Sequence, residues 1–266
     1  MNVTRVSTSR KLFALIATTL LLPAVGHATI VQFETNLGDF QVNLYDNDTP
    51  QTVANFLAYV QNGDYSESVV HRSVAGFIIQ GGAVTTDDLG VLSEIPTRPA
   101  VQNEPVFANV RGTIAMAKLG GNPDSATSQW FFNLANNTGN LDNQNGGSTV
   151  FGEVIGNGMD VVDAIAAVPT FNNVAGLNDF PLQNYTAPNP IVKDNFVVIT
   201  SITVIDTNAN SADGLNPQPT TRTDNNNGGG QNLGGGGGGG GGNLGWLAIC
   251  GLLGLSWRRY RLLQNV

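Results

Sequence analysis

The most informative run in this chain is Val70-His71-Arg72-Ser73-Val74-Ala75-Gly76-Phe77-Ile78-Ile79-Gln80-Gly81-Gly82. Its alternating apolar residues predict strands at Val69–Ser73 and Phe77–Gln80. Because side chains alternate across a strand, Arg72 and Val74 share one face, as do Ile78 and Gln80. An arginine, an aromatic ring, an aliphatic side chain and an amide therefore fall within nine residues of strand-like sequence.

Strand patterns dominate the sequence on both sides of this run. Thr29–Glu34 and Asp39–Tyr45 alternate with period two around the tight turn Asn36-Leu37-Gly38, which predicts a hairpin. Further strands are expected at Thr113–Ala117, Gln129–Leu134, Val150–Val154 and Asn195–Ile205.

Two helices are expected at separated points. The first begins at Thr49-Pro50, as an N-cap followed by a proline at the first helical position, and ends at Asn62-Gly63. The second covers Met159–Val168 and stops before Pro169. Many short strands with two separated helices predict a mainly β fold, a closed eight-stranded antiparallel β-barrel capped by two α-helices.

The first 28 residues have the layout of a secretory signal peptide. Arg5, Arg10 and Lys11 precede an apolar run from Leu12 to Val25, and small residues surround a cleavage point after Ala28. An uncleaved N-terminal anchor is the alternative, but the apolar run is short for a membrane span.

The C-terminal part changes composition twice. Residues 207–243 lose nearly all apolar content and end in the unbroken glycine run Gly234–Gly242, which predicts a disordered linker. Residues 244–266 combine a short apolar stretch with Arg258, Arg259 and Arg261. This layout resembles the GlyGly-type sorting tail of Gram-negative surface proteins, which a rhomboid-type protease removes. A plain membrane anchor is the alternative, and the arginines fit its cytoplasmic side.

Residues 29–206 are long enough for one domain with its own core. Without the two terminal segments the chain keeps 6 basic and 20 acidic residues, a formal charge of −14, which argues against nucleic acid or an anionic membrane as a partner. The single cysteine, Cys250, lies in the tail, so the domain has no disulfide. The domain contains one histidine, His71, so a histidine-rich metal site is excluded, and we expect no metal or other cofactor.

Three motifs in fixed order resemble the cyclophilin family. The run around Arg72 is similar to its His-Arg, Gly-Phe and Gln-Gly-Gly signature. Thr113–Ala117 resembles its Met-Ala strand, and Ser128-Gln129-Trp130-Phe131 resembles its Ser-Gln-Phe-Phe strand. Leu141-Asp142, Val150-Phe151-Gly152 and Gly158–Val162 continue the match, so the resemblance covers about residues 29 to 206.

The resemblance implies a peptidyl-prolyl cis/trans isomerase and assigns roles by position. It implies a catalytic group of Arg72, Phe77 and Gln80. It implies substrate contacts from Ile78, Ala117, Lys118, Gln129, Phe131 and Leu141. Taken singly, these residues also fit structural roles, as core side chains or a surface ion-pair partner; only their ordered combination favours the site.

Three features depart from the family pattern. Asn140 stands where many members carry tryptophan, which weakens any inference of cyclosporin binding, and Ser148 stands where many carry a pocket histidine. Thr86–Val101 also fits the family poorly, and substrate preference is expected to differ there.

We therefore expect an isomerase that acts on X-Pro bonds of exported proteins and assists their folding. Its partners would be proline-containing polypeptides, with membrane contact only through the C-terminal segment, and the chain would be a monomer. It would be periplasmic, cell-surface or secreted, and anchored through its tail until cleavage. A catalytically silent proline-peptide binding or chaperone module on the same fold is the alternative. A barrel that carries a small apolar ligand fits less well, because the lumen-lining polar pattern of such barrels is missing.

Overall fold

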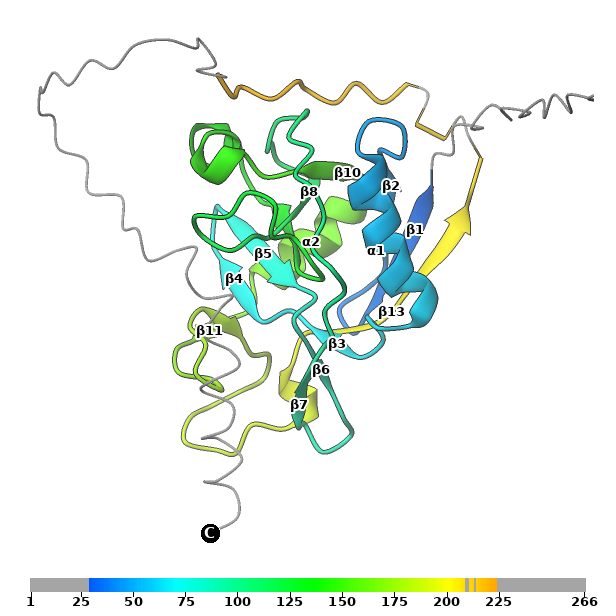
Figure 1. Ribbon diagram of the computed structural model, residues 1–266. Coiled ribbons are helices and arrows are strands. Elements are labelled where there is room, and N and C mark those ends of the chain that lie inside the picture. Colours follow the sequence, from blue (N-terminus) through cyan, green and yellow to red (C-terminus); the bar gives the residue numbers. More distant parts are fainter. Residues whose placement is uncertain (1–28, 209–210, 213, 224–266) are drawn as a thin grey trace, which may run out of the picture.

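Eleven short strands form one curled antiparallel sheet in the computed structural model, which describes residues 29–208, 211–212 and 214–223 (Figure 1). Their hydrogen-bonded order is β4-β5-β9-β8-β10-β2-β1-β13-β3-β6-β7. The strands are β1 (Ile30–Thr35), β2 (Phe40–Leu44), β3 (Ser68–Val69), β4 (Arg72–Val74), β5 (Ile78–Gly81), β6 (Val84–Thr86), β7 (Leu92–Glu94), β8 (Thr113–Met116), β9 (Trp130–Asn133), β10 (Val150–Ile155) and β13 (Val198–Asp206). A second sheet pairs β11 (Thr170–Phe171) with β12 (Phe180–Pro181).

The mainly β expectation is confirmed, whereas closure into an eight-stranded barrel is not. Within the described residues, the ladder ends at β4 on one side and at β7 on the other, and these two strands do not pair. One continuous segment links the two halves instead. Val70 N–H donates to Val197 O at 3.0 Å on the β13 side, and His71 N–H donates to Gln80 O at 3.0 Å on the β5 side. The chain from β3 to β4 thus crosses from one half of the curled sheet to the other.

Both expected helices are present. They are α1 (Pro50–Asn62) and α2 (Gly158–Ala166), and three short helical turns, η1 (Thr138–Asp142), η2 (Gln144–Gly146) and η3 (Lys193–Asn195), accompany them. Gly63 ends α1 in a left-handed conformation that glycine adopts without a steric penalty. Both helices bury apolar faces, including Phe56 and Val162, in the core inside the sheet.

Aromatic side chains fill the centre of that core. Phe33 stacks on Phe40 with 4.9 Å between ring centroids, and the edge of Trp130 meets Phe33 at 5.4 Å. Trp130 also explains Gly81, because a Cβ there would lie 2.6 Å from its ring, while a Cβ on Gly82 would lie 2.5 Å from the Ser128 carbonyl. Gly82 has φ +80° as well, so any other residue there would be strained.

Thr49 precedes α1 as predicted, but its side chain does not cap the helix. Its hydroxyl donates to Tyr45 O instead. The carboxylate of Glu104 accepts from Thr52 N–H at 2.9 Å, Thr52 Oγ1 at 2.8 Å and Gln51 N–H at 3.3 Å. A residue more than 50 positions away therefore satisfies the orphan amides of the first turn.

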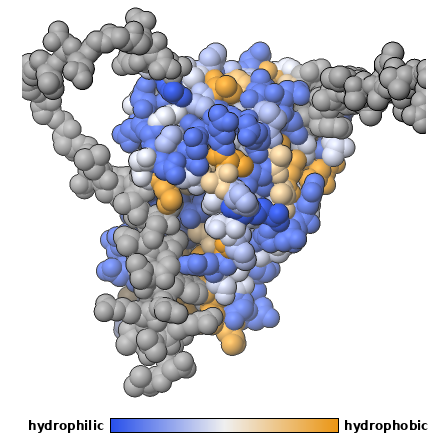
Figure 2. All heavy atoms as spheres, viewed as in Figure 1, coloured by the Kyte–Doolittle hydropathy of each residue, from blue (hydrophilic) through white to orange (hydrophobic). Residues whose placement is uncertain are grey.

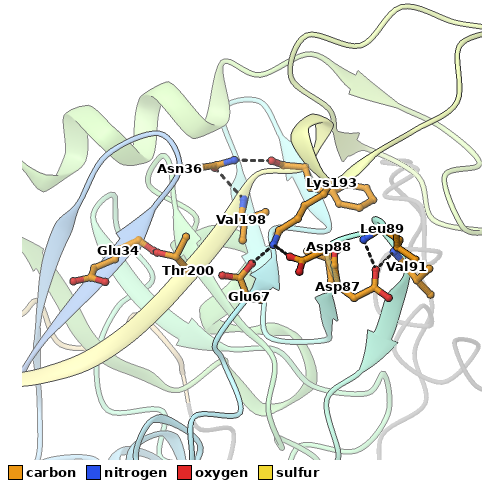
Figure 3. A network of polar contacts seen from close by, with 12 residues as sticks. Glu34, Asn36, Glu67, Asp87, Asp88, Leu89, Val91, Lys193, Val198 and Thr200 are labelled. Atoms are coloured by element: carbon orange, nitrogen blue, oxygen red, sulfur yellow. Dashed lines mark hydrogen bonds and ion pairs between the residues drawn. The ribbon is translucent and has the colours of Figure 1, made fainter.

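A polar network fixes the hairpin of β6 and β7 to the segment that leads into β13 (Figure 3). Lys193 Nζ lies 2.9 Å from Glu67 Oε2 and 3.0 Å from Asp88 Oδ1. Nearby, Asn36 Nδ2 donates to Phe196 O at 2.9 Å, and its Oδ1 accepts from Val198 N–H at 3.0 Å. The turn and the second strand of this hairpin fall within Thr86–Val101, the segment that fitted the family poorly.

The packed region extends past the predicted domain boundary at Asp206. The described residues beyond it, orange in Figure 1, run across one end of the molecule and contact the domain, although the sequence assigned them to a disordered linker. Hydrogen bonds from backbone and side-chain groups hold the described part of this segment, whereas the disordered linker over residues 207–243 stays a prediction. The predicted signal peptide at 1–28, the rest of the linker and the tail at 244–266 lie outside the described residues.

Hydrophilic side chains cover most of the face shown in Figure 2, with hydrophobic ones scattered between them. Across the described ranges, we find no helix with the length and apolar character needed to cross a membrane.

We predict that Glu104→Ala lowers the free energy of unfolding by about 1–2 kcal/mol, because it removes the acceptor for three donors at the start of α1. Chemical denaturation would measure the change. Glu94→Ala, at an exposed strand position, is the matched control and should change stability by less than about 0.5 kcal/mol. Equal stability of the two variants would show that Glu104 does not cap the helix.

Candidate functional site

A row of cross-strand partners forms the centre of the candidate site. Arg72 on β4 pairs with Gln80 on β5, and Gln80 pairs in turn with Phe131 on β9. Directly opposed residues on neighbouring strands point to the same face of a sheet. The register alone therefore brings the guanidinium, the amide and the aromatic ring side by side.

One pocket, which encloses about 60 Å³, collects eight of the nine residues that the sequence singled out. They are Arg72, Phe77, Ile78, Gln80, Ala117, Lys118, Phe131 and Leu141. Asn140, Gln144, Asn145 and Ser148 complete the lining. The two positions that depart from the family pattern, Asn140 and Ser148, thus lie on the pocket wall, whereas no residue of Thr86–Val101 lines it.

Gln129, the ninth residue, supports the pocket from behind. Its Oε1 accepts a hydrogen bond of 2.9 Å from Gln80 Nε2, so it orients the amide that lines the pocket. His71 lies next to it and is buried. Burial lowers the pKa of His71 to about 4, against the opposing effect of its hydrogen bond to Gln129. The imidazole is therefore neutral near pH 7. It does not line the pocket but contacts Gln129, which in turn orients Gln80.

Arg72 is held by a loop that the sequence analysis missed. Its Nε lies 3.8 Å from Asp179 Oδ2, and its side chain is only 12 % exposed. The carbonyl of Asp179 also accepts from Ser73 N–H at 2.8 Å, which ties the loop before β12 to β4. No local sequence pattern predicts the contact of Asp179 with Arg72, because the two residues lie more than 100 positions apart.

Lys118 lines the pocket, but its ammonium is directed into the wall. The side chain is 4 % exposed, and Nζ donates to the carbonyls of Asn145 and Gly147. Burial lowers the pKa of Lys118 to about 8. Through these two hydrogen bonds, the ammonium of Lys118 connects the turn at η2 to the end of β8.

The wall that carries Leu141 is anchored by a buried carboxylate. Asp142 is 1 % exposed and accepts hydrogen bonds from Asn109 N–H at 2.8 Å and Asn109 Nδ2 at 2.9 Å. Thr221 donates two more, from N–H at 2.8 Å and from Oγ1 at 2.9 Å. Burial alone would raise the pKa of Asp142, but these hydrogen bonds hold it below its usual value. Asp142 entered the sequence analysis only as part of a motif and received no role.

The lining of the site contains two cations, Arg72 and Lys118, together with neutral polar and apolar side chains. Across the described residues, no group of three or more histidine, cysteine, aspartate or glutamate side chains is placed to hold a metal ion.

Comparison with known proteins identifies one family. The model of the cyclophilin type peptidyl-prolyl cis-trans isomerase/CLD family matches residues 30–187. The peptidyl-prolyl cis-trans isomerase of Acinetobacter baylyi is 44 % identical over 164 residues, which span 60 % of this chain and 84 % of that protein. Peptidyl-prolyl cis-trans isomerase A of Dickeya dadantii is 38 % identical over 174 residues, 62 % of this chain and 88 % of the relative. Peptidyl-prolyl cis-trans isomerase B of Escherichia coli is 39 % identical over 147 residues, 53 % of this chain and 86 % of the relative.

A solved structure supports the fold. The crystal structure of a cyclophilin type peptidyl-prolyl cis-trans isomerase from Cryptosporidium parvum superimposes with a TM-score of 0.50 at 22 % identity. The match covers 68 % of this chain and 99 % of that one.

We predict that His71 makes the domain sensitive to acid. Its pKa rises from about 4 in the folded state to its ordinary value of 6.5 on unfolding, so the unfolded chain binds an extra proton between these values. Stability from this residue is therefore present above pH 6.5 and lost as the pH falls toward 4, by about 3 kcal/mol in total.

Denaturant unfolding of the wild type and of His71→Gln, from pH 7 to pH 4, measures this effect. The variant cannot take up the proton and should lose stability less steeply. Parallel pH curves for the two proteins would contradict the burial of a neutral imidazole.

Proposed function

The chain belongs to the cyclophilin type peptidyl-prolyl cis-trans isomerases, and on that basis we propose that the pocket around Arg72 is the active site of an isomerase for X-Pro bonds in exported polypeptides. One observation carries the proposal. Arg72, Gln80 and Phe131 stand in one cross-strand row, at the edge of a pocket that also contains four apolar side chains.

The chemistry requires no bond to break. Amide resonance blocks rotation about an X-Pro bond with a barrier of about 20 kcal/mol, and uncatalysed isomerisation takes tens of seconds or longer. A rate gain of about 10⁵ requires the site to favour the twisted state by about 7 kcal/mol. Neither a nucleophile nor a metal is needed for this step.

Arg72 supplies the main electrostatic contribution. A guanidinium that donates to the imide nitrogen localises its lone pair and weakens the partial double bond. Arginine stays protonated at all relevant pH values and presents a rigid fork of donors. The Asp179 carboxylate, 3.8 Å from Arg72 Nε, attracts the guanidinium electrostatically toward the loop before β12.

The pocket grips the proline ring and excludes water. Phe77, Ile78, Phe131 and Leu141 are the large apolar side chains of the lining, and Ala117 adds a small one. A ring held there places its imide nitrogen toward the Arg72 end of the row. Gln80, held by Gln129, is positioned to accept or donate a hydrogen bond to the peptide backbone as the carbonyl rotates.

We predict that Arg72→Ala lowers kcat/KM for an Ala-Pro peptide by about 10²- to 10³-fold, the usual cost of losing one preorganised donor. Exchange spectroscopy by NMR measures the cis/trans rate directly. Arg98→Ala is the matched control, because Arg98 pairs with Asp64 at 3.3 Å and does not line the pocket.

A wild-type protein that binds the peptide but leaves exchange at the uncatalysed rate would favour the silent binding module. Full activity in Arg72→Ala would instead move the active site away from this pocket.

Export of the chain is the second part of the proposal. The charged, apolar and small-residue layout of residues 1–28 supports it, and so does the position of Thr29. Thr29 N–H lies 2.9 Å from Asp46 Oδ2, and its hydroxyl donates to Asp46 Oδ1 at 2.8 Å. Cleavage after Ala28 would turn this amide into an ammonium group and the contact into an ion pair.

We predict that the exported protein begins at Thr29. Mass spectrometry of the mature protein, after expression in a Gram-negative host, would identify its N-terminus. Purification from the membrane with residues 1–28 still attached would support an N-terminal anchor instead. Recovery of the protein in the cytoplasm with an intact N-terminus would contradict export.

A further inference from the structure

The segment Leu215–Arg222, here called the strap, lies beyond the family match at residues 30–187 and is bound beside the pocket. Ala108 N–H donates to Gln218 O at 2.8 Å, and Thr220 N–H donates to Val106 O at 3.0 Å. Pro219 stands between these two bonds, opposite Phe107, where no N–H is needed. The strap therefore adds a short antiparallel pairing to the domain.

The strap shares an apolar cluster with the pocket. Leu215 packs in the same group of side chains as Phe107, Phe131 and Leu141. Two of these, Phe131 and Leu141, line the pocket itself. Removal of the strap would thus take one apolar side chain from a cluster that includes two pocket-lining residues.

The strap also closes the hydrogen-bond shell of Asp142. Thr221 supplies both donors to Oδ2, while Asn109 supplies both donors to Oδ1. An ionised carboxylate that is 1 % exposed and lacks half its donors would be strongly destabilised. Without the donors of Thr221, Oδ2 must find other partners, and any shift of the turn at η1 that brings Asp142 toward water would move Leu141 with it.

A chain of buried amides links Asp142 to the opposite side of the pocket. Asn109 Nδ2 also donates to Ser148 O at 3.2 Å, and its Oδ1 accepts from Asn133 Nδ2 at 3.3 Å. Asn137 Nδ2 then joins Asn133 Oδ1 at 2.8 Å to Phe77 O at 2.9 Å. Asn109 and Asn133 are fully buried. One connected network thus holds the backbone of Ser148 and of Phe77, both of which line the pocket.

Arg222 adds a further contact on the same wall. Its Nη1 donates to Gly146 O at 3.0 Å, in the turn η2. That turn carries Gln144 and Asn145, which line the pocket.

We propose that the strap is a positioning element for the substrate pocket and that Thr221, acting through Asp142, is its positioning residue. Thr221 is not among the residues that line the pocket, so its effect is on the geometry of the wall that receives the substrate. The inference rests on the proposed assignment of the pocket as the substrate site. It means that the segment between the domain and the C-terminal tail tunes how tightly a proline-containing peptide is held.

A graded series of substitutions in the full chain tests this inference. Thr221→Ser keeps both donors to Asp142, Thr221→Val keeps only the backbone N–H, and Thr221→Pro keeps neither. Thr223→Pro is the matched control, since Thr223 is an exposed threonine two residues further on. For each protein, NMR exchange gives kcat and KM for an Ala-Pro peptide, titration gives the peptide Kd, and thermal unfolding confirms folding.

We expect KM and Kd to rise about threefold in Thr221→Val and about tenfold in Thr221→Pro, with kcat within about twofold of the wild type. Thr221→Ser and Thr223→Pro should match the wild type. Should Thr221→Pro fail to fold, the comparison of Thr221→Val with Thr221→Ser still decides the question.

Equal KM and Kd in Thr221→Val, Thr221→Pro and Thr223→Pro would overturn the inference, and so would a loss of kcat at constant KM. A failure of the proposed function looks different. In that case the wild type shows no catalysed exchange, or Arg72→Ala retains it, whereas the peptide Kd still reports whether the strap shapes the pocket.

Discussion

The register of β5 is the constraint on which both the core and the candidate site depend. Ile79 faces the central core, while its neighbours Ile78 and Gln80 face the pocket. A slip of one residue would exchange these faces and place the amide of Gln80 in the core. The close approach of Gly81 to Trp130 opposes a slip that would bring Gln80 into that position, because a Cβ there would clash with the indole. The same packing contact therefore fixes the core and aligns Gln80 with Arg72.

The far wall of the pocket depends on polar contacts rather than on strand pairing. Residues 138–148 form only short helical turns, so tertiary partners must satisfy many of their backbone groups. Lys118 provides one such partner as a buried donor to the carbonyls of Asn145 and Gly147. Asp142 connects the wall to the rest of the domain as a buried acceptor for donors of Asn109 and Thr221. Each pays a desolvation penalty that its hydrogen bonds offset, and each would be costly to leave unpaired. Such a wall has few alternative arrangements, which suits a site that must hold a ring while its neighbouring bond rotates.

Local patterns in the sequence predicted most of what is local in the structure. The first hairpin, the start of α1 at Pro50 and its end at Gly63 follow from period-two alternation and from cap residues. The ordered motifs, which resemble a known family, singled out nine site residues, and eight of these line one pocket. Contacts from distant positions had no such signal. Glu104 as a helix cap, Asp179 beside Arg72 and the strap on Asp142 all involve partners more than 50 residues apart. Composition predicted a disordered linker for residues 207–243, because it counts apolar side chains and carries no information on the hydrogen bonds that Thr221 gives to Asp142.

Two adjacent residues, His71 and Arg72, differ in how pH affects them: His71 links pH to stability, whereas Arg72 has the proposed role in catalysis. Rotation about an imide bond transfers no proton, and Arg72 keeps its charge throughout the range in which proteins are folded. Lys118 is the pocket-lining group whose charge changes nearest to neutral pH, with a pKa of about 8, and its ammonium contacts the wall. On the acid side, His71 lies behind the pocket and gains its proton only as the domain loses stability. A fall in activity below pH 6 would thus reflect the folded fraction of the protein, since no group in the proposed chemistry changes its protonation state there.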